Sequence, residues 1–440
     1  MNLPEYIKLI LQRFEKNNIP AYAVGGCVRD MIMGKEPNDY DITTQALPQQ
    51  IKELFFDVPV IETGIKHGTV TLLWENKPVE ITTYRIDGKY LNNRRPENVE
   101  FTLDLKDDLC RRDFTINAMA YSLDGKLIDL FGGKQDIENK IIKCVGEPDK
   151  RFEEDALRIL RALRFASTLG FETDKKTADS ILKNYPLLKN ISAERIFSEF
   201  KKILCGKNVK NILLQFSDVF AEIIPQVKES IGFLQNNPHH IYDVYTHSAY
   251  VVENSPPDEI SRLSAFFHDI GKPFCYTEDQ IGTGHFHGHA KISKELCNKA
   301  LNALKADNKT KALVCQIVEN HDYQIIPEEK YVRRFLAKNN YEQSMRILAL
   351  KRAESFSKAV LDDDRSKYVD TIEALIEKIV AQEDCLNLKA LKINGHDLIE
   401  NNIKGKKIGQ TLNLLLKLVI DKEIENEKEA LLNKAKQLNS

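Results

Sequence analysis

The stretch that decides the fold lies between residues 25 and 41 and reads Gly25-Gly26-Cys27-Val28-Arg29-Asp30, then Gly34, then Asp39-Tyr40-Asp41. The apolar residues 21–24 precede it and predict a short strand. Two glycines after a strand let the backbone approach a phosphate, and Arg29, at the start of a predicted helix, can bind a phosphate bidentately. Asp39 and Asp41 alternate on an extended segment, so both carboxylates project from one face and suit Mg²⁺. A glycine turn with two solvated aspartates is the alternative for either motif alone, but their combination favours a phosphate and metal site.

Length and composition narrow the class of protein. With 440 residues, 42% of them hydrophobic and 29% charged, the chain predicts a globular protein of several domains. The net charge of −2 excludes a bulk polycation, so any nucleic-acid binding must come from local basic patches. No apolar run approaches the ~20 residues that span a bilayer, and residues 1–19 predict an amphipathic helix rather than a signal peptide. Eight cysteines without a Cys-x-x-Cys pair favour a reduced, cytoplasmic compartment.

Strand signals are concentrated before about residue 130. Residues 68–74 and 79–84 predict a hairpin around the turn 75–78. Glu80 lies in the second arm, where it either faces solvent or forms a third carboxylate beside Asp39 and Asp41. Residues 85–100 have little apolar periodicity and predict a mobile loop.

A second polar segment reads Leu109-Cys110-Arg111-Arg112-Asp113-Phe114-Thr115-Ile116-Asn117-Ala118. Its two arginines could bind phosphates, and Asp113 and Asn117 could contact a sugar. The alternative is an exposed Arg–Asp pair that caps a buried helix.

Residues 153–166 predict one helix with a charged stripe. The stripe recurs every third residue and comprises Asp155, Arg158, Arg161 and Arg164. The leucines between them are expected to pack. For a generic helix, the stripe would be an exposed charged face whose i,i+3 pair contributes ~0.2–0.5 kcal/mol.

Histidines gather in the second half of the chain as His247, His268-Asp269, His289 and His321-Asp322. Residues 264–272 predict an apolar helix that ends in His268-Asp269 and a glycine. One histidine in an apolar run is usually a core residue. A series across successive helices instead suits a metal site, because neutral imidazoles and carboxylates bind divalent metals and can activate water.

The two head motifs, Gly-Gly-x-Val-Arg-Asp…Asp-x-Asp and Arg-Arg-Asp-Phe-Thr-Ile-Asn-Ala, together resemble the class II tRNA nucleotidyltransferase and bacterial poly(A) polymerase family. That family belongs to the DNA polymerase β-like nucleotidyltransferase superfamily. The histidine series resembles the HD metal-dependent phosphohydrolase superfamily. The resemblance implies an α+β head followed by all-α neck, HD, body and tail domains. We expect the head at 1–138, the neck at 139–225, the HD domain at 226–330, and a tRNA-binding body and tail at 331–440.

For the head, the resemblance implies two Mg²⁺ ions on Asp39 and Asp41, with Glu80 at the place of the third carboxylate. Such a site clamps the attacking RNA 3′-hydroxyl and the leaving pyrophosphate of an in-line transfer. The family pattern places Gly26, Arg29 and Arg112 at the triphosphate. The expected nucleotide-binding set is Gly25, Gly26, Arg29, Arg112, Asp113, Asn117, Asp155, Arg158, Arg161 and Arg164.

In the neck, the Glu-Asp-x-x-Arg pattern implies that Asp155 and Arg158 read the incoming base. A carboxylate can accept from the amino group of cytosine or adenine, and an arginine can donate to cytosine N3 or adenine N1. Uracil and guanine present a carbonyl and a ring N–H at these positions, so both contacts become repulsive and UTP and GTP are rejected. Residues 191–200 resemble the next helical motif of the family, which we expect to brace this helix.

In the HD segment, the resemblance implies a divalent transition metal on the six residues His247, His268, Asp269, His289, His321 and Asp322. A catalytic role there is a separate prediction from nucleotide transfer.

We therefore expect a cytoplasmic enzyme that adds CCA, or its terminal A, to tRNA 3′ ends from CTP and ATP. Poly(A) polymerase is the nearest alternative, and the intact segment 85–96 argues against CC-only addition. An HD phosphohydrolase with a nucleotide-sensing head and a non-catalytic RNA-binding protein are further alternatives, which the three carboxylates disfavour. Arg333, Arg334, Lys351 and Arg352 either line an RNA path or lie on the surface, and a lysine-bearing turn at 404–409 either holds an RNA phosphate or is a plain loop. No membrane partner is expected, and the oligomeric state is left open.

Overall fold

The computed structural model describes residues 2–88, 90–91, 93, 95–237, 241–357 and 363–439. The chain divides into two compact units. The first comprises Met1–Lys228 with Ala303–Lys305, and the second comprises Glu229–Asn302 with Ala306–Ser440. No helix among the described residues is long and apolar enough to cross a membrane.

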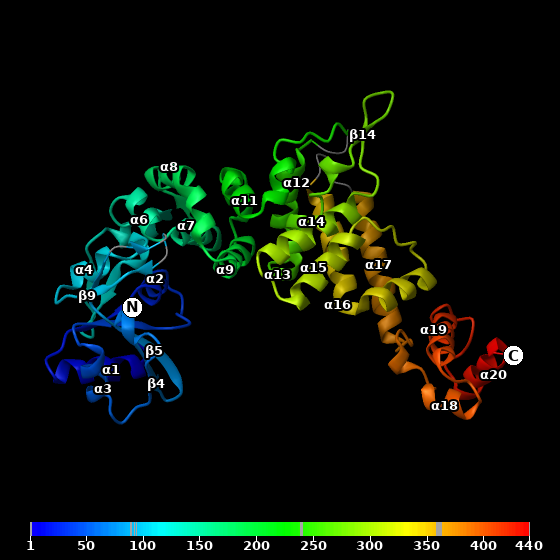
Figure 1. Ribbon diagram of the computed structural model, residues 1–440, viewed down its shortest axis with the longest axis horizontal. Helices are drawn as coiled ribbons and strands as arrows, with labels where there is room; N and C mark the ends of the chain where they lie inside the picture. Colours follow the sequence, from blue (N-terminus) through cyan, green and yellow to red (C-terminus); the bar gives the residue numbers. More distant parts are fainter. Residues whose placement is uncertain are drawn as a thin grey trace. The chain divides into compact units, whose positions relative to one another are not determined.

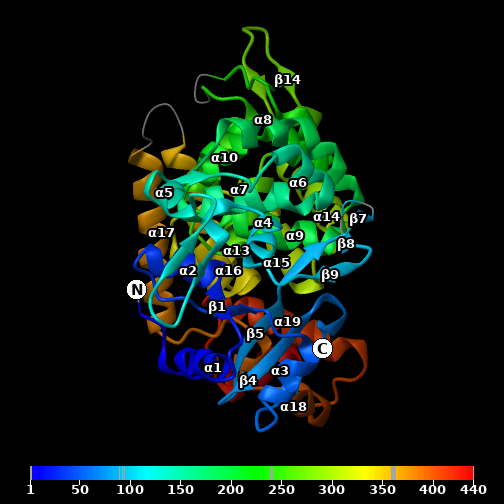
Figure 2. The same ribbon diagram turned by 90° about the vertical axis from the view of Figure 1, so that its left-hand side faces the viewer.

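A seven-stranded sheet forms the head, in the order β11-β10-β1-β2-β5-β4-β3. Its neighbours pair antiparallel except β2 and β5, which are parallel. The helices α1 and α3 lie beside β4 and β5 (Figures 1 and 2), where Phe14, Phe55 and Trp74 pack edge to face. The strands are β1 Ala21–Val24, β2 Asp41–Thr44, β3 Val60–Ile61, β4 Thr69–Trp74, β5 Lys77–Thr83, β10 Met119–Tyr121 and β11 Leu127–Asp129. The head helices are α1 Glu5–Lys16, α2 Gly26–Ile32, α3 Pro48–Leu54, α4 Leu105–Cys110 and α5 Gly133–Glu138.

Two local predictions for the head need correction. The hairpin is confirmed, but its turn is only Glu75-Asn76, both with positive φ, which is the geometry of a two-residue turn that matches the strand twist. The predicted loop at 85–100 contains two short antiparallel ladders. These ladders are held by backbone hydrogen bonds rather than by an alternating apolar pattern, so the hydrophobic periodicity of the sequence could not predict them. The strands are β6 Arg85–Asp87 with β9 Val99–Phe101, and β7 Tyr90–Leu91 with β8 Arg95–Pro96. Lys89, Asn92 and Arg94 of this loop lie outside the described residues.

The neck follows as a group of helices with one small parallel sheet. The helix predicted over 153–166 is wrong as a single element, because Asp155 is extended (φ −133°, ψ 103°) and separates α6 from α7. Its Oδ1 accepts from the backbone N–H of Leu157 at 3.1 Å and so satisfies one of the free donors in the first turn of α7. The elements are α6 Pro148–Glu154, α7 Leu157–Leu169, α8 Lys175–Asn184, α9 Ala193–Leu204, α10 Val209–Gln215, α11 Ser217–Ile223, β12 Ile141–Ile142 and β13 Glu172–Thr173.

The second unit is almost entirely helical (Figure 1). Its long helix α16 is bent at Asn340 (φ 58°), whose side chain accepts from the N–H of Gln343 at 3.1 Å and restarts the helix. A separate hydrophobic cluster around Leu398, Leu415 and Leu431 holds the tail together. The elements are α12 Val244–Asn254, α13 Glu259–Phe267, β14 Thr277–Glu278, β15 Gly284–His285, α14 His289–Ala303, α15 Asn308–Asn320, α16 Glu329–Phe356, α17 Asp363–Ala381, α18 Gly395–Glu400, α19 Lys406–Ile420 and α20 Lys428–Asn439.

The four cations of α16 are all paired with protein groups, and they lie on the surface, as one of the two readings predicted, only at exposed Arg334 and partly exposed Arg352. Arg333 is buried and donates to the carbonyl of Ile420 at 2.8 Å, and Lys351 is buried and donates to the carbonyl of His321. Arg334 binds Asp421 through two hydrogen bonds of 2.6 Å. Arg352 forms ion pairs of 2.7 Å with Asp370 and Glu373. These cations stabilise the packing of the helices.

Candidate functional site

Three exposed carboxylates of the head gather where β2 and β5 lie side by side. Asp41 is the first residue of β2, and Asp39 precedes it. Glu80 on β5 is in register with Asp41 across the parallel pair. Residues in register on neighbouring strands are ~4.8 Å apart and project from the same face. Of the two readings of Glu80, the structure therefore places it beside Asp41.

The environment of Asp41 disfavours its charged form. Loss of hydration raises the pKa of Asp41 to about 6, Glu80 and Asp39 add to the increase, and Arg112 opposes it. A bound cation would favour the ionised carboxylate of Asp41 again. Hard oxygen donors of this kind fit a divalent cation such as Mg²⁺.

The turn after β1 is formed by glycine, and its backbone, which carries no side chain, faces both Arg112 and Asp41. Gly25 has φ 83°, which glycine adopts without a steric penalty, and α2 begins at the next residue. A Cβ atom at position 25 would lie 3.1 Å from Arg112 Nη1 and 3.9 Å from Asp41 Oδ2. A side chain there would intrude on the space between these two charged groups.

Four polar residues that the sequence assigned to the nucleotide form a hydrogen-bonded chain from the head to the neck. Arg29 Nη1 donates to Asn117 Oδ1 at 2.8 Å, and Asn117 Nδ2 donates to Asp113 Oδ1 at 3.2 Å. Arg161 donates to Asp113 Oδ2 through Nε at 2.8 Å and Nη2 at 2.5 Å. Burial acts to raise the pKa of Asp113, but Arg161 outweighs it and the pKa falls to about 2. Asp113 and Asn117 thus contact protein in this structure, and their contact with a sugar stays a prediction.

Asp155 and Arg158 are also engaged by protein groups. Asp155 Oδ2 is 3.2 Å from Arg195 Nη2 of α9. Arg158 is buried, donates through Nη1 to Glu154 Oε2 at 2.6 Å and through Nη2 to the carbonyl of Arg111 at 2.9 Å. A base read by Asp155 and Arg158 would have to compete with these partners.

The remaining arginines of the charged stripe pack, together with Arg29 of α2, around one aromatic ring. The guanidinium carbons of Arg29, Arg161 and Arg164 lie 5.2, 5.6 and 4.2 Å from the ring centroid of Phe165. Arg164 Nε is also 2.7 Å from Glu199 Oε2 of α9. Together with the Asp155–Arg195 pair, this contact confirms that α9 braces α7.

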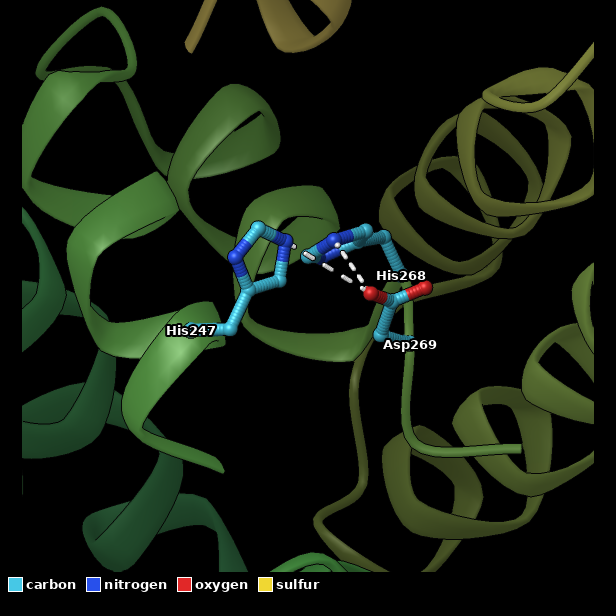
Figure 3. A group of neighbouring side chains, drawn as sticks. All are labelled: His247, His268 and Asp269. Carbon is cyan, nitrogen blue, oxygen red and sulfur yellow. Dashed lines mark ion pairs between the residues drawn. The ribbon is translucent and has the colours of Figure 1, made fainter. Parts of the chain in front are cut away.

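In the second unit, a compact cluster joins four helices around Asp269. His247 comes from α12, His268 and Asp269 from the end of α13, His289 from the start of α14 and His321 from the end of α15. Asp269 Oδ2 is 3.1 Å from His268 Nε2 and 3.6 Å from His247 Nε2, and both imidazoles turn toward it (Figure 3). Asp269 Oδ1 is 3.3 Å from His289 Nε2 and 3.6 Å from His321 Nε2. All five side chains are buried.

Backbone carbonyls orient three of these histidines. The Nδ1 atoms of His268, His289 and His321 lie 2.7, 2.9 and 2.7 Å from the carbonyl oxygens of Ala265, Phe286 and Val318. Because a carbonyl can only accept, each Nδ1 carries a proton, and in the neutral ring Nε2 offers its lone pair to the centre. Ligating histidines are held in this way in metal sites.

A cavity of 340 Å³ opens onto the cluster and brings in residues to which sequence reasoning gave no role. Lys272 Nζ is 2.7 Å from Asp269 Oδ2, and Glu354 Oε1 of α16 is 3.8 Å from His268 Nε2. Lys272 belongs to the segment 264–272 that the sequence analysis singled out, so its position offered a signal. Glu354 lies in a helix that the sequence analysis assigned to the body, so no sequence signal linked it to the cluster. Asp322 lines the same cavity but is exposed and lies outside the two groups whose ligand atoms come within 4.8 Å of one another.

Comparison with known proteins places this chain in a family. A model of the poly A polymerase head domain matches residues 21–143. A model of the RNA- and SrmB-binding site of polymerase A matches 170–231, and one of tRNA nucleotidyltransferase domain 2 matches 285–435. A CCA-adding enzyme of Ligilactobacillus salivarius is 34% identical over 450 residues, which cover 99% of this chain and 98% of that protein. The chain belongs to the CCA-adding enzyme family.

Two further members are similar to it. The CCA-adding enzyme of Lactobacillus helveticus is 46% identical over 230 residues, which cover 52% of this chain and 57% of that protein. The Bacillus stearothermophilus CCA-adding enzyme, solved in complex with CTP, is 27% identical with a TM-score of 0.76, and the match covers 100% of this chain and 98% of that one.

Family membership confirms the predicted class of enzyme, a tRNA nucleotidyltransferase, and the predicted mixed α/β head with helical domains after it. The nucleotidyltransferase fold of CCA-adding enzymes also implies a divalent metal. The matched models describe the head and tRNA nucleotidyltransferase segments, so the HD interpretation rests on the geometry around Asp269.

Proposed function

We propose that this protein adds C and A nucleotides, as CCA or its terminal A, to the 3′ end of tRNA, using CTP and ATP and releasing pyrophosphate. The observation that carries the proposal is the register of Asp41 with Glu80, next to Asp39 and opposite the bare turn at Gly25. A similar enzyme was solved with CTP, and family membership supports tRNA as the acceptor. The eight free cysteines agree with a cytoplasmic location, which we propose as well.

In this proposal, Asp39 and Asp41 hold two Mg²⁺ ions, with Glu80 as the third carboxylate. When bound, such ions stabilise the attacking and leaving oxygens of phosphoryl transfer. Gly25 and Gly26 let the backbone approach the triphosphate, and Arg29 and Arg112 neutralise its charge. Arg161 helps to keep Arg29 in place through the hydrogen-bonded chain of Asp113 and Asn117.

Asp155 and Arg158 select the base in this proposal, once they exchange Arg195 and Glu154 for the nucleotide. The Asp155–Arg195 pair is partly exposed and stabilises little, whereas Arg158 is buried, so the base would have to replace the hydrogen bond that Glu154 accepts from it. Cytosine and adenine satisfy both residues, whereas uracil and guanine leave a donor facing a donor and an acceptor facing an acceptor.

The deciding experiment uses three tRNA transcripts that end before CCA, after C and after CC, each incubated with CTP, ATP or both. The proposal expects CTP to extend the first two and ATP to extend the third. Long A tails on any of the three would establish poly(A) polymerase instead. Extension of the CC-ended tRNA alone would restrict the activity to the terminal A.

We also propose a second function, metal-dependent phosphohydrolysis at the cluster around Asp269. The specific observation is that three histidines present Nε2 toward one buried carboxylate beside a 340 Å³ cavity. His247, His268, Asp269, His289 and His321 would hold a divalent transition metal, and exposed Asp322 would have to turn inward to join them. Substrates would be terminal phosphates, such as a cyclic or 2′-phosphate on a damaged tRNA end. Hydrolysis of the cyclic ester to a 2′-phosphate frees the 3′-hydroxyl that the head needs, and hydrolysis of the 2′-phosphate restores the 2′-hydroxyl beside it.

Metal analysis of the purified protein tests this second function, together with phosphatase and cyclic phosphodiesterase assays under Mg²⁺, Mn²⁺, Ni²⁺ and Co²⁺. Bound metal and phosphate release are expected. Neither metal nor release under any of the four ions would leave the cluster with an architectural role.

The proposed division of labour keeps the expected boundaries, with the head at 1–138, the neck at 139–225, the HD domain at 226–330, and the body and tail at 331–440 holding tRNA. The cavity beside Asp269 is also lined by Glu354 of α16, which lies beyond the expected boundary at residue 330. In the tail, the turn at Gly405 (φ 63°) feeds the helix α19, and its lysines are proposed to contact an RNA phosphate.

A further inference from the structure

Asp108 is a fully buried carboxylate of the head that the proposed mechanism has not used. Its Oδ2 accepts from Arg112 Nη2 at 3.2 Å and from Thr43 Oγ1 at 3.0 Å. Its Oδ1 accepts from Arg111 Nε at 2.9 Å and Nη2 at 2.7 Å. Burial acts to raise the pKa of Asp108, but Arg112 and Arg111 outweigh it and the pKa is lowered. A buried charge is retained only where such partners compensate its lost hydration.

The contact with Asp108 determines where the guanidinium of Arg112 lies. While Nη2 is held by Asp108, Nη1 lies 3.1 Å from the place of a Cβ atom at Gly25, and the positive charge lowers the pKa of Asp41 against the effects that raise it. Arg112 Nε is buried and has no hydrogen-bond partner among the described residues. One end of the guanidinium is thus anchored, and the other faces the open turn.

The anchor itself is rigid and connected to the carboxylate strands. Leu109, the residue after Asp108, is fully buried and packs with Val24 of β1 and Ala120 of β10. Thr43 follows Asp41 on the same face of β2, and its hydroxyl is also 3.3 Å from the carbonyl of Thr82 on β5. Asp108 therefore contacts both the cation and one of the two strands that carry Asp41 and Glu80.

We infer that Asp108 is a positioning residue, which holds Arg112 beside Asp41 so that the guanidinium meets the triphosphate of the incoming nucleotide. The inference rests on the proposed function of the head. Since the triphosphate is common to CTP and ATP, Asp108 should act equally on both nucleotides and leave the choice of base unchanged.

The test compares wild type with Asp108→Asn, Arg112→Ala, the double variant and Thr43→Val, which removes one hydrogen bond of the same carboxylate oxygen but keeps both arginines paired. Asp108→Asn should raise KM for CTP and for ATP by the same factor, about tenfold. Thr43→Val should change KM less than about twofold. If Asp108 acts through Arg112, the double variant should have the KM of Arg112→Ala alone, because the two effects are not independent.

A merely structural role predicts a different pattern. Asp108→Asn would then reduce the fraction of active enzyme and lower kcat at unchanged KM, or its effect on KM would add fully to that of Arg112→Ala. Either result would overturn the inference. Asp108→Glu is the second variant should the asparagine protein fold poorly. It keeps the charge one methylene further out, and a KM between those of wild type and Arg112→Ala is expected, again equal for both nucleotides.

Calorimetric titration of CTP with Mg²⁺, without tRNA, separates this inference from the proposed function. If CTP binds Asp108→Asn more weakly than Thr43→Val, the positioning role is supported, whether or not wild type extends tRNA. Absence of tRNA extension by wild type would refute only the transfer function. Active wild type with equal nucleotide affinity in both variants would refute only the positioning role.

Discussion

The carboxylates of the head and the cluster around Asp269 represent two opposite ways of building a candidate metal site. Asp39 and Asp41 are exposed at the start of β2, and Glu80 is exposed in the middle of the paired strand β5. Asp269 and its four histidines are buried, and its oxygens lie 3.1–3.6 Å from every one of them. Among the described residues, the groups of three ligands within 4.8 Å occur around Asp269 and not in the head.

This difference indicates which bound ions each of the two sites requires. The head brings three carboxylates together with Arg112 as the cation that acts on Asp41, so divalent metal ions would have to compensate the remaining negative charge. The Asp269 cluster is already oriented by carbonyls and by Lys272, so a metal would replace existing contacts rather than assemble the site. Variants in the two regions should therefore fail in different ways.

The largest effect is expected in the head. Asp41→Ala should reduce nucleotide addition by about 10³-fold or more, because the proposed metal ligand is lost while tRNA binding persists. Single-turnover incorporation of labelled CMP measures the rate, and a gel-shift assay measures tRNA binding. Asp124→Ala, at an exposed aspartate of the same unit, is the control and should behave like wild type. Wild-type turnover of Asp41→Ala would contradict the assignment.

Next, Asp269→Ala should abolish bound metal and phosphohydrolysis, while C and A addition stays within about twofold of wild type. Removing one partner of a buried charge cluster also destabilises, typically by about 3–5 kcal/mol, so the second unit should unfold at lower temperature. Metal content, hydrolysis and tRNA extension are measured on one preparation. A parallel loss of both activities would contradict the independence of the two regions.

A smaller effect concerns selectivity within the neck. Arg158→Ala or Asp155→Ala should relax discrimination against UTP and GTP by about 10–100-fold, since the repulsive contacts disappear together with the attractive ones. The ratio of kcat/KM for CTP to that for UTP measures the change. Arg151→Ala is the matched control, because it breaks the other ion pair of Glu154 without removing a base-reading group. Equal selectivity in Arg158→Ala and wild type would place base reading elsewhere.

The smallest effect is on stability without metal. The pKa of Asp41 is raised to about 6 from an ordinary value near 3.8, so the folded protein binds more protons than the unfolded chain between these pH values. Stability contributed by the protonated form is therefore present at low pH and is lost as pH rises through about 6. Asp41→Asn should melt a few degrees higher than wild type at pH 7.5 in EDTA, and Mg²⁺ should raise the melting temperature of wild type only. If Mg²⁺ stabilised both proteins, the stabilising ion would not be bound by the Asp41 carboxylate.

Which parts could be predicted depends on how local their causes are. The strand at 21–24, the helix α2 after Gly25 and the helix ending at His268-Asp269 follow from short patterns, and the structure confirms them. The break at Asp155 was missed, because helix propensity is summed over a window, whereas one side chain that accepts from the N–H of Leu157 and binds Arg195 interrupts the helix.

The sequence by itself determined the order of the catalytic motifs, the class of enzyme and most of the polar residues in the two candidate sites, because these depend on residue type and spacing along the chain. Only the tertiary structure decided which residues meet. It put Glu80 in register with Asp41, brought Glu354 of α16 to His268 and buried Asp108 under Arg112. Contacts between residues far apart in the chain depend on strand register and helix packing, and no local pattern encodes either of them.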